Sequence, residues 1–282
     1  MKKTVISLCL GLTFLWVSAA GAVLVDPYDN ILPPDGLYGL YYGNYYQADR
    51  INDASGNKAL DIDLTAKVSL LRGLYYHHFG KIPIALQVIV PFGEVKETKL
   101  LNEKSSGLGD ITFGPGVFLY TNEKSGTYLS YWLYLTAPTG EWNMNQAINL
   151  GQNHWYFEHQ LALEQLWKGF VYDMNLNLYH HNKESDNNFQ APKRFEVEAS
   201  LGYQLTDKLI LGVNGGGYWD LENGKVGGSS VADTKARRLQ FGPTLGYQAT
   251  EKIGVNLRWT HDLSAKNDTQ GDDVWLRLSY AF

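Results

Sequence analysis

The sequence has almost no cysteine and no long apolar run beyond its first residues. Its one cysteine is Cys9, so the chain cannot form an internal disulfide. No stretch after the start of the chain approaches the roughly 20 apolar residues that a transmembrane helix requires. The sequence therefore excludes a disulfide-stapled fold and a bundle of membrane-spanning helices.

Basic residues are in the minority as well. The chain carries 24 Lys and Arg against 29 Asp and Glu. Binding to nucleic acid needs a basic patch, and none is visible, so we expect no nucleic-acid partner. The mean hydropathy is polar. This does not exclude a membrane protein, because only every second residue of a barrel wall has to be apolar.

Residues 1–22 have the pattern of a secretory signal peptide. Lys2 and Lys3 precede an apolar run over residues 5–17, and Ala20-Gly21-Ala22 fits a cleavage site with small residues. Cleavage near Ala22 would remove Cys9 and leave 22 basic against 29 acidic residues. We expect no lipid attachment at Cys9, because it lies inside the apolar run.

The last nine residues alternate between two kinds of side chain. One parity holds Val274, Leu276, Leu278, Tyr280 and Phe282, and the other holds Trp275, Arg277, Ser279 and Ala281. The pattern predicts a strand with one apolar face. Such a strand would leave a sticky edge in a soluble sheet, whereas a closed barrel has no edge and can turn this face to lipid. We interpret Tyr280 and Phe282 as an assembly signal for the barrel-assembly machinery.

The same alternation recurs along the chain and predicts twelve strands. Residues 60–70 alternate without an error, over about the 9–11 residues that a tilted strand needs to cross a bilayer. The predicted strands are 36–48, 60–76, 82–93, 107–121, 126–137, 154–166, 170–181, 194–205, 208–220, 235–248, 252–263 and 272–282. Their connections alternate between long and short, and the long ones are 49–59, 94–106, 138–153, 182–193, 221–234 and 264–271.

Short periplasmic turns and longer external loops are typical of outer-membrane barrels. We therefore predict an all-β fold, a transmembrane antiparallel up-and-down β-barrel of about 12 strands over residues 36–282. Residues 23–35 contain Pro27, Pro33 and Pro34 and are too short for a domain. We expect a loose periplasmic N-terminal segment there, and the alternative is a plug that folds into the lumen.

Several short motifs are spread over nearly the whole chain after residue 35. They are Gly36-Leu37-Tyr38, Tyr42, Tyr46, Ala48-Asp49-Arg50, Asp53, Gly56-Asn57, Gly107-Leu108-Gly109-Asp110-Ile111, Thr136-Ala137-Pro138-Thr139-Gly140, Asn149-Leu150-Gly151-Gln152-Asn153-His154-Trp155-Tyr156-Phe157-Glu158 and Gly271-Asp272-Asp273. In these motifs the chain resembles the outer-membrane family named after the meta-pathway of phenol degradation. One departure is His159, where the family pattern has proline. The resemblance implies a barrel for passage of small aromatic or hydrophobic compounds, and it fixes no solute.

We expect the polar parity of the strands to face the lumen, where its charges are candidates for selectivity. The candidates are Asp61, Asp63 and Lys67 on strand two, Glu158, Glu164, Asp173, Glu196 and Glu198 on strands six to eight, and Arg238, Arg258 and Arg277 on strands ten to twelve. In a ring of twelve strands the last two groups face one another. They either create a field across an open pore or pair across a narrow interior.

The remaining polar motifs do not point to chemistry. His77-His78 and His180-His181 are adjacent pairs, and neighbours on a strand point to opposite faces, so we expect no metal site. Neither His-x-Ser nor Gly-x-Ser-x-Gly occurs, and His261-Asp262 has no evident serine partner. We therefore predict no enzymatic activity, although a lipid hydrolase or deacylase remains an alternative.

Taken as a whole, the pattern predicts a channel in the outer membrane of a Gram-negative bacterium, with lipid and a small solute as its partners. Passive passage of small solutes needs no cofactor, because a concentration gradient drives it. A structural or adhesive barrel that acts through its external loops is the other alternative.

Overall fold

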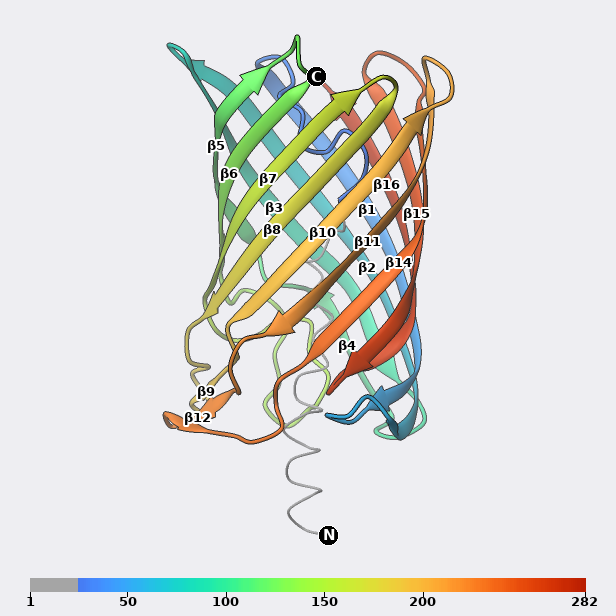
Figure 1. Cartoon of the computed structure of the whole chain (residues 1–282). Helices are drawn as coiled ribbons and strands as arrows, with labels where there is room; N and C mark the ends of the chain where they lie inside the picture. The colour runs from blue at the N-terminus through green and yellow to red at the C-terminus, as the bar shows by residue number, and fades with distance from the viewer. Residues whose placement is uncertain (1–24) are drawn as a thin grey trace.

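The computed structural model describes residues 25–282 and shows a closed antiparallel β-barrel (Figure 1). The strands of its wall are β1 (Gly36–Asn52), β2 (Lys58–Phe79), β3 (Ile82–Glu97), β5 (Thr112–Asn122), β6 (Thr127–Thr136), β7 (Tyr156–Trp167), β8 (Phe170–His181), β10 (Arg194–Gln204), β11 (Leu209–Asp220), β14 (Arg237–Gln248), β15 (Ile253–Lys266) and β16 (Thr269–Ala281). Each strand pairs with its neighbours along the chain, and β16 pairs with β1 to close the ring. The predicted barrel of twelve strands is confirmed. The predicted signal peptide lies outside the described residues.

The two rims of the barrel differ in the length of their connections. At the turn rim, where the C-terminus lies in Figure 1, adjacent strands are joined by short turns. Lys168 and Gly169, between β7 and β8, both have positive φ angles of 50° and 84°, as a two-residue turn of type I′ requires. In outer-membrane barrels the short turns face the periplasm.

The opposite end, the loop rim, carries the longer connections. They include the short strands β4 (Glu103–Leu108), β9 (Phe189–Gln190), β12 (Lys225–Val226) and β13 (Ser229–Ser230). β4 extends the pairing of β3, and β9, β12 and β13 form a small separate sheet. The predicted long loop 264–271 is wrong, since β15 and β16 run on to a two-residue turn at Asn267 and Asp268. No helix among residues 25–282 is long and apolar enough to cross a membrane.

The outer face of the barrel is an apolar belt. Side chains of a strand alternate between its two faces, and the exposed parity of most strands is aliphatic or aromatic. The belt includes Leu71, Tyr75, Leu86, Val88, Phe113, Leu161, Leu201, Leu211, Phe241, Leu245, Leu257, Leu276 and Leu278, all more than a third exposed. An exposed apolar surface of this extent is the face that a transmembrane barrel presents to lipid.

Strand β2 reverses the predicted assignment of its two faces. Leu64 and Ala66 are 1 % and 0 % exposed and point into the barrel, whereas Asp61, Asp63 and Lys67 are exposed on the outside. The expectation that these three charges line the lumen is therefore wrong. They lie toward the loop rim, where Asp61 forms ion pairs with the lysines at positions 58 and 99, and charge on an outer surface beyond the bilayer meets water at little cost.

Candidate functional site

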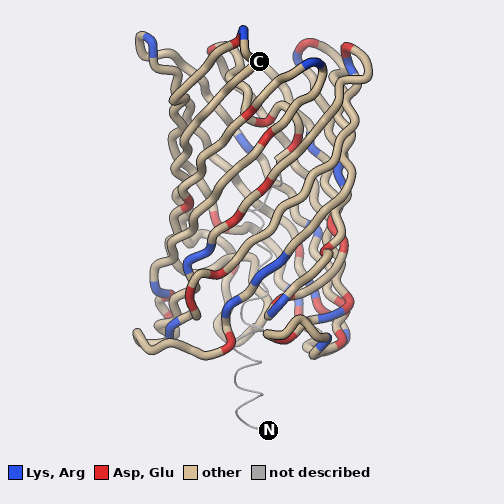
Figure 2. Tube along the Cα trace, viewed as in Figure 1, with Lys and Arg blue, Asp and Glu red and all other residues tan. Residues whose placement is uncertain are grey.

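The inner wall of the barrel is divided into three sectors. The apolar sector comprises inward side chains of β1, β2, β3, β5 and β6: Tyr42, Tyr46, Leu64, Val68, Leu70, Leu74, Tyr76, Ile89, Phe118, Trp132 and Tyr134. The acidic sector on β7, β8 and β10 holds Glu158, Glu164, Asp173, Glu196 and Glu198, all buried. The arginine sector on β14, β15 and β16 holds Arg238, Arg258 and Arg277. Figure 2 shows how these charges follow the strands.

Residues 25–35, here called the N-terminal plug, lie inside the barrel near the turn rim (Figure 1). The backbone amides of the plug meet the acidic sector. The amides of Tyr28 and Asn30 donate to the carboxylate of Asp173 at 3.1 and 3.2 Å, and the Asn30 amide also donates to Glu164 at 3.1 Å. The Asn30 side chain donates to Asn175 at 3.0 Å. The acidic sector thus binds peptide N–H groups of the plug.

The acidic side chains of the plug meet the arginine sector. Asp26 forms an ion pair with Arg258 at 3.3 Å, with side chains 3 % and 1 % exposed, and Asp29 forms one with Arg277. The Thr244 hydroxyl donates to Asp26 at 2.9 Å. The plug therefore complements both sectors at once, and it lies between the acidic and arginine sectors as neither of the two alternatives for these charges had foreseen.

These contacts correct the expectation for residues 25–35. A loose periplasmic tail is wrong for residues 25–35, and the alternative of a plug in the lumen describes their position. The sequence holds one usable signal, the acidic residues Asp26 and Asp29 in a short segment ahead of a barrel with inward arginines. Their partners are more than 200 positions away, so no local pattern could show the pairing.

Arg238 is occupied by residues of its own neighbourhood. Its guanidinium forms an ion pair with Asp268 at 2.7 Å and lies 5.3 Å from the ring centre of Tyr46. Burial raises the pKa of Asp268, in the turn between β15 and β16, to about 7, and the positive charge of Arg194 offsets part of this shift. Arg238 therefore stabilises the turn between β15 and β16 at the loop rim and does not bind the plug through this ion pair.

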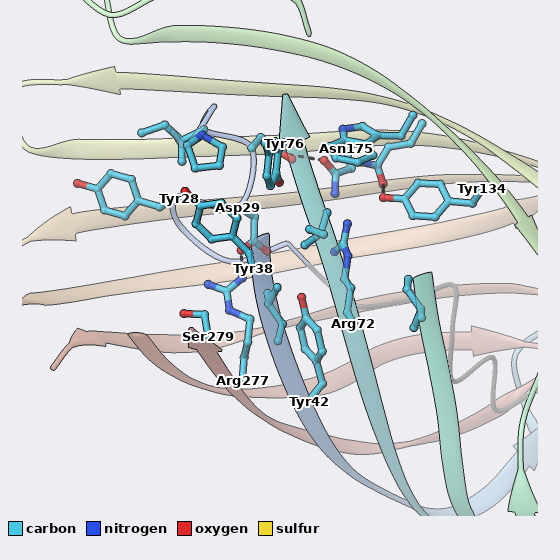
Figure 3. Close-up of a pocket in the computed structure, with 18 of the residues that line it drawn as sticks. Tyr28, Asp29, Tyr38, Tyr42, Arg72, Tyr76, Tyr134, Asn175, Arg277 and Ser279 are labelled. Carbon is cyan, nitrogen blue, oxygen red and sulfur yellow. Dashed lines mark hydrogen bonds and ion pairs between the residues drawn. The ribbon is translucent and has the colours of Figure 1, made fainter. Parts of the chain in front are cut away.

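A cavity of about 210 Å³ lies between the plug and the wall (Figure 3). Tyr28 and Asp29 of the plug form one side of it. Its lining also includes aromatic rings of the apolar sector, Glu158 and Glu198 of the acidic sector, Arg277 of the arginine sector, and Arg72. Arg72 is a residue that the sequence analysis missed, because reversing the faces of β2 placed it on the outside. The sequence signal for Arg72 was that it is an arginine among the apolar residues on the same face of β2.

The connection between β6 and β7, residues 137–155, folds into the loop rim and is here called the loop cap. Its Ile148 and Leu150 are 0 % and 6 % exposed and pack against the apolar sector. The carboxylate of Asp110 accepts the backbone amides of Gly140 at 2.8 Å and Gln152 at 2.7 Å. Burial raises the pKa of Asp110, and these hydrogen bonds oppose that shift. The three sequence motifs that contain Asp110, Gly140 and Gln152 are therefore joined by hydrogen bonds at one place on the loop rim.

The two histidine pairs lie at opposite rims of the barrel, His77-His78 near the end of β2 and His180-His181 at the end of β8. His77 and His78 both lie beside Asp35 at the turn rim. No cluster of three or more His, Cys, Asp or Glu side chains among residues 25–282 is arranged to hold a metal ion.

Comparisons with known proteins agree with this geometry. A family model described as "Putative MetA-pathway of phenol degradation" matches residues 48–278, which confirms the resemblance read from the motifs. A crystallised outer membrane channel from Pseudomonas putida F1 is similar, with 25 % identity and a TM-score of 0.84 over 92 % of this chain and 100 % of that chain.

More distant barrels share the fold alone. The NanC porin has 7 % identity and a TM-score of 0.51 over 86 % of this chain and 100 % of its own. The translocator domain of the autotransporter NalP from Neisseria meningitidis has 12 % identity and a TM-score of 0.50 over 90 % and 91 %. The chain matches no curated protein.

Proposed function

The chain belongs to the outer-membrane family named for the MetA-pathway of phenol degradation, and on this premise we propose that it is a channel for passive passage of small solutes. The apolar outer belt and the charged acidic and arginine sectors inside suit a pore through lipid, and the similar barrel from Pseudomonas putida F1 is an outer membrane channel. The family name makes aromatic or hydrophobic compounds the first solutes to test. Secretion with cleavage near Ala22, and insertion by the barrel-assembly machinery through Tyr280 and Phe282, belong to the same proposal.

The observation that carries the proposal is the N-terminal plug held between charged sectors. The plug is bound by Arg258, Arg277, Glu164 and Asp173. The first role of these charges is therefore to hold the plug, which acts as a gate. Passage requires the plug to shift and expose the charges to the solute. A seat of ion pairs and hydrogen bonds suits this role, because water and a polar solute can replace both kinds of contact.

The test is liposome swelling and single-channel recording with the purified barrel. A chain that lacks residues 25–33, and the double variant Arg258→Ala with Arg277→Ala, should both show higher conductance than the wild type. Arg237→Ala is the matched control, because Arg237 is exposed at the loop-rim end of β14. A panel of sugars, organic acids and phenols then ranks the solutes.

Two results would overturn the proposal. If neither the wild type nor the plug deletion lets any solute of the panel into liposomes, the barrel is not a channel. If deletion of residues 25–33 leaves conductance and ion selectivity unchanged, the segment is not a gate.

Among residues 25–282, no hydrogen bond of an outward-facing histidine favours the alternative of a lipid hydrolase. A catalytic serine needs a base within hydrogen-bond reach. Neither of these bonds of the outward-facing His159 and His261 goes to a serine: His159 bonds to the Tyr131 hydroxyl at 2.7 Å, and His261 bonds to Asp272 at 3.1 Å. Acyl release from phospholipid or lipopolysaccharide by the purified barrel would revive that alternative.

A further inference from the structure

Arg72 is a cation that faces the lumen and forms no ion pair within 4 Å among residues 25–282, and Glu158 of the same cavity acts on it only at longer range. By contrast, Arg194, Arg238, Arg258 and Arg277 each form an ion pair with an aspartate. The Nε of Arg72 donates to Gln87 at 2.8 Å, its guanidinium bonds to the Tyr42 hydroxyl, and it lies 6.0 Å from the ring centre of Trp132. A guanidinium has five N–H donors, so capacity for an anion remains.

The cavity beside Arg72 is shaped for a ring. Tyr76 and Trp132 meet edge to face with centroids 6.5 Å apart, and Trp132 and Tyr134 lie 6.3 Å apart. All three rings line the cavity. An apolar cavity of about 150 Å³ admits one benzene molecule, so the volume of about 210 Å³ has room for one ring with small substituents. Aromatic walls favour an aromatic guest through offset and edge-to-face contacts.

The far side of the same cavity offers a hydrogen-bond acceptor. In the ring of strands β10 lies opposite β2, and Glu198 of β10 lines the cavity. Glu198 is 2 % exposed, and its Oε2 accepts from Asn175 at 3.2 Å. Its Oε1 has no hydrogen-bond partner among the described residues. A buried polar atom of this kind is costly unless a ligand or water satisfies it.

From these three observations we propose that the cavity binds a monocyclic aromatic carboxylate whose ring carries a hydroxyl group. The carboxylate pairs with the Arg72 guanidinium, for which a planar two-oxygen anion is the best geometric match. The ring packs against the aromatic wall that Tyr76, Trp132 and Tyr134 form together, and the hydroxyl donates to Glu198. This site rests on the proposed channel function and names the solute class that the channel would select.

The test is equilibrium binding to the purified full-length barrel in detergent, with 4-hydroxybenzoate as the main probe. Titration calorimetry should show saturable binding, with benzoate weaker and cyclohexanecarboxylate, phenol and benzylamine weaker still. Arg72→Gln should lower affinity for 4-hydroxybenzoate by about 10- to 100-fold, the worth of hydrogen bonds to a charged group. Arg72→Lys keeps the positive charge but lacks the planar pair of N–H donors, so its affinity should lie between those of the wild type and Arg72→Gln. Arg237→Gln is the matched control.

The second arm tests the acceptor. Glu198→Ala should lower the affinity for 4-hydroxybenzoate to that for benzoate while leaving benzoate itself no weaker. Heat-modifiable migration on gels shows that each variant is folded before it is titrated. The proposal fails if folded protein binds none of the carboxylates, if Arg72→Gln binds 4-hydroxybenzoate as well as the wild type, or if benzylamine is the tightest ligand.

Liposome swelling by small sugars separates this site from the channel function. Swelling without carboxylate binding would overturn the site and leave the channel. Carboxylate binding without swelling by any solute would overturn the channel function and leave the binding site.

Discussion

The lumen is filled from its two ends by different interactions. At the loop rim the loop cap, residues 137–155, rests on the apolar sector through Ile148 and Leu150 and is fastened by backbone amides to Asp110. At the turn rim the N-terminal plug, residues 25–35, is held by ion pairs to Arg258 and Arg277 and by amides that donate to carboxylates. The loop cap thus combines apolar contacts with hydrogen bonds, whereas the plug is held by charged groups of the wall.

This difference identifies the part that can move. The loop cap is tied at both ends, to β6 and to β7, and its apolar contacts have no substitute in water. The plug joins the wall at β1, and each of its polar contacts can be exchanged for water or for a solute. We therefore expect the loop cap to be a fixed constriction and the N-terminal plug to be the gate.

The largest effect is expected where the apolar sector receives a charge. Leu64→Asp would place an unpaired carboxylate inside the barrel, which costs about 3–5 kcal/mol when a buried charge has no partner. The folded fraction, read from heat-modifiable migration after refolding in detergent, should collapse. Thr65→Asp is the control, because Thr65 faces outward opposite Lys96. If Thr65→Asp were the damaging change, the faces of β2 would be assigned the wrong way round.

The next effect concerns the loop cap alone. Ile148→Ala should loosen the cap by about 2–5 kcal/mol, the usual loss for truncating a fully buried aliphatic side chain, without unfolding the wall. Faster amide hydrogen exchange in residues 137–155 and a higher single-channel conductance would show it. Met144→Ala serves as control, since Met144 in the same cap is 62 % exposed. Unchanged exchange in Ile148→Ala would mean that the apolar contacts do not hold the cap.

The N-terminal plug should respond to a smaller, polar change. Asp26→Asn removes one charge of the pair with Arg258, and hydrogen bonds to charged groups contribute about 1.5–3 kcal/mol each. A cysteine placed at Ile31 should then react faster with a maleimide, whereas Asp207→Asn in the exposed turn between β10 and β11 should leave the rate unchanged. Equal rates in all three proteins would show that the ion pair does not retain the plug.

The strands and the inward placement of the acidic and arginine sectors could be predicted, because alternation and loop length are local properties of the sequence. The faces of β2 could not, since an apolar parity that faces a packed interior reads the same as one that faces lipid. Arg72 was lost with that assignment. The plug could be given only as an alternative to a loose tail, because the pair between Asp26 and Arg258 depends on closure of the whole ring.

The smallest effect is a pH response confined to the loop between β8 and β9 at the loop rim. Burial raises the pKa of Glu184 to about 7, and the Asn187 side chain offsets part of the shift. Because the folded pKa is raised, Glu184 contributes its stability below the ordinary pKa of a glutamate, and that contribution is lost as pH rises through about 7. The hydrogen bond from the Glu184 amide to the Phe189 carbonyl, 2.7 Å long, closes this loop.

Amide exchange at Glu184, corrected for intrinsic base catalysis, should therefore accelerate between pH 5 and 8, and Glu184→Gln should remove the dependence. Glu222 supplies the comparison, because it lies in a neighbouring loop but is held by Lys225, whose ammonium lowers the pKa of that carboxyl. Glu222→Gln should leave the response of residue 184 intact. A pH response that survived in Glu184→Gln would have to come from another group. In that case another titratable group at the loop rim, distinct from the N-terminal plug and the loop cap, would control the opening of this loop.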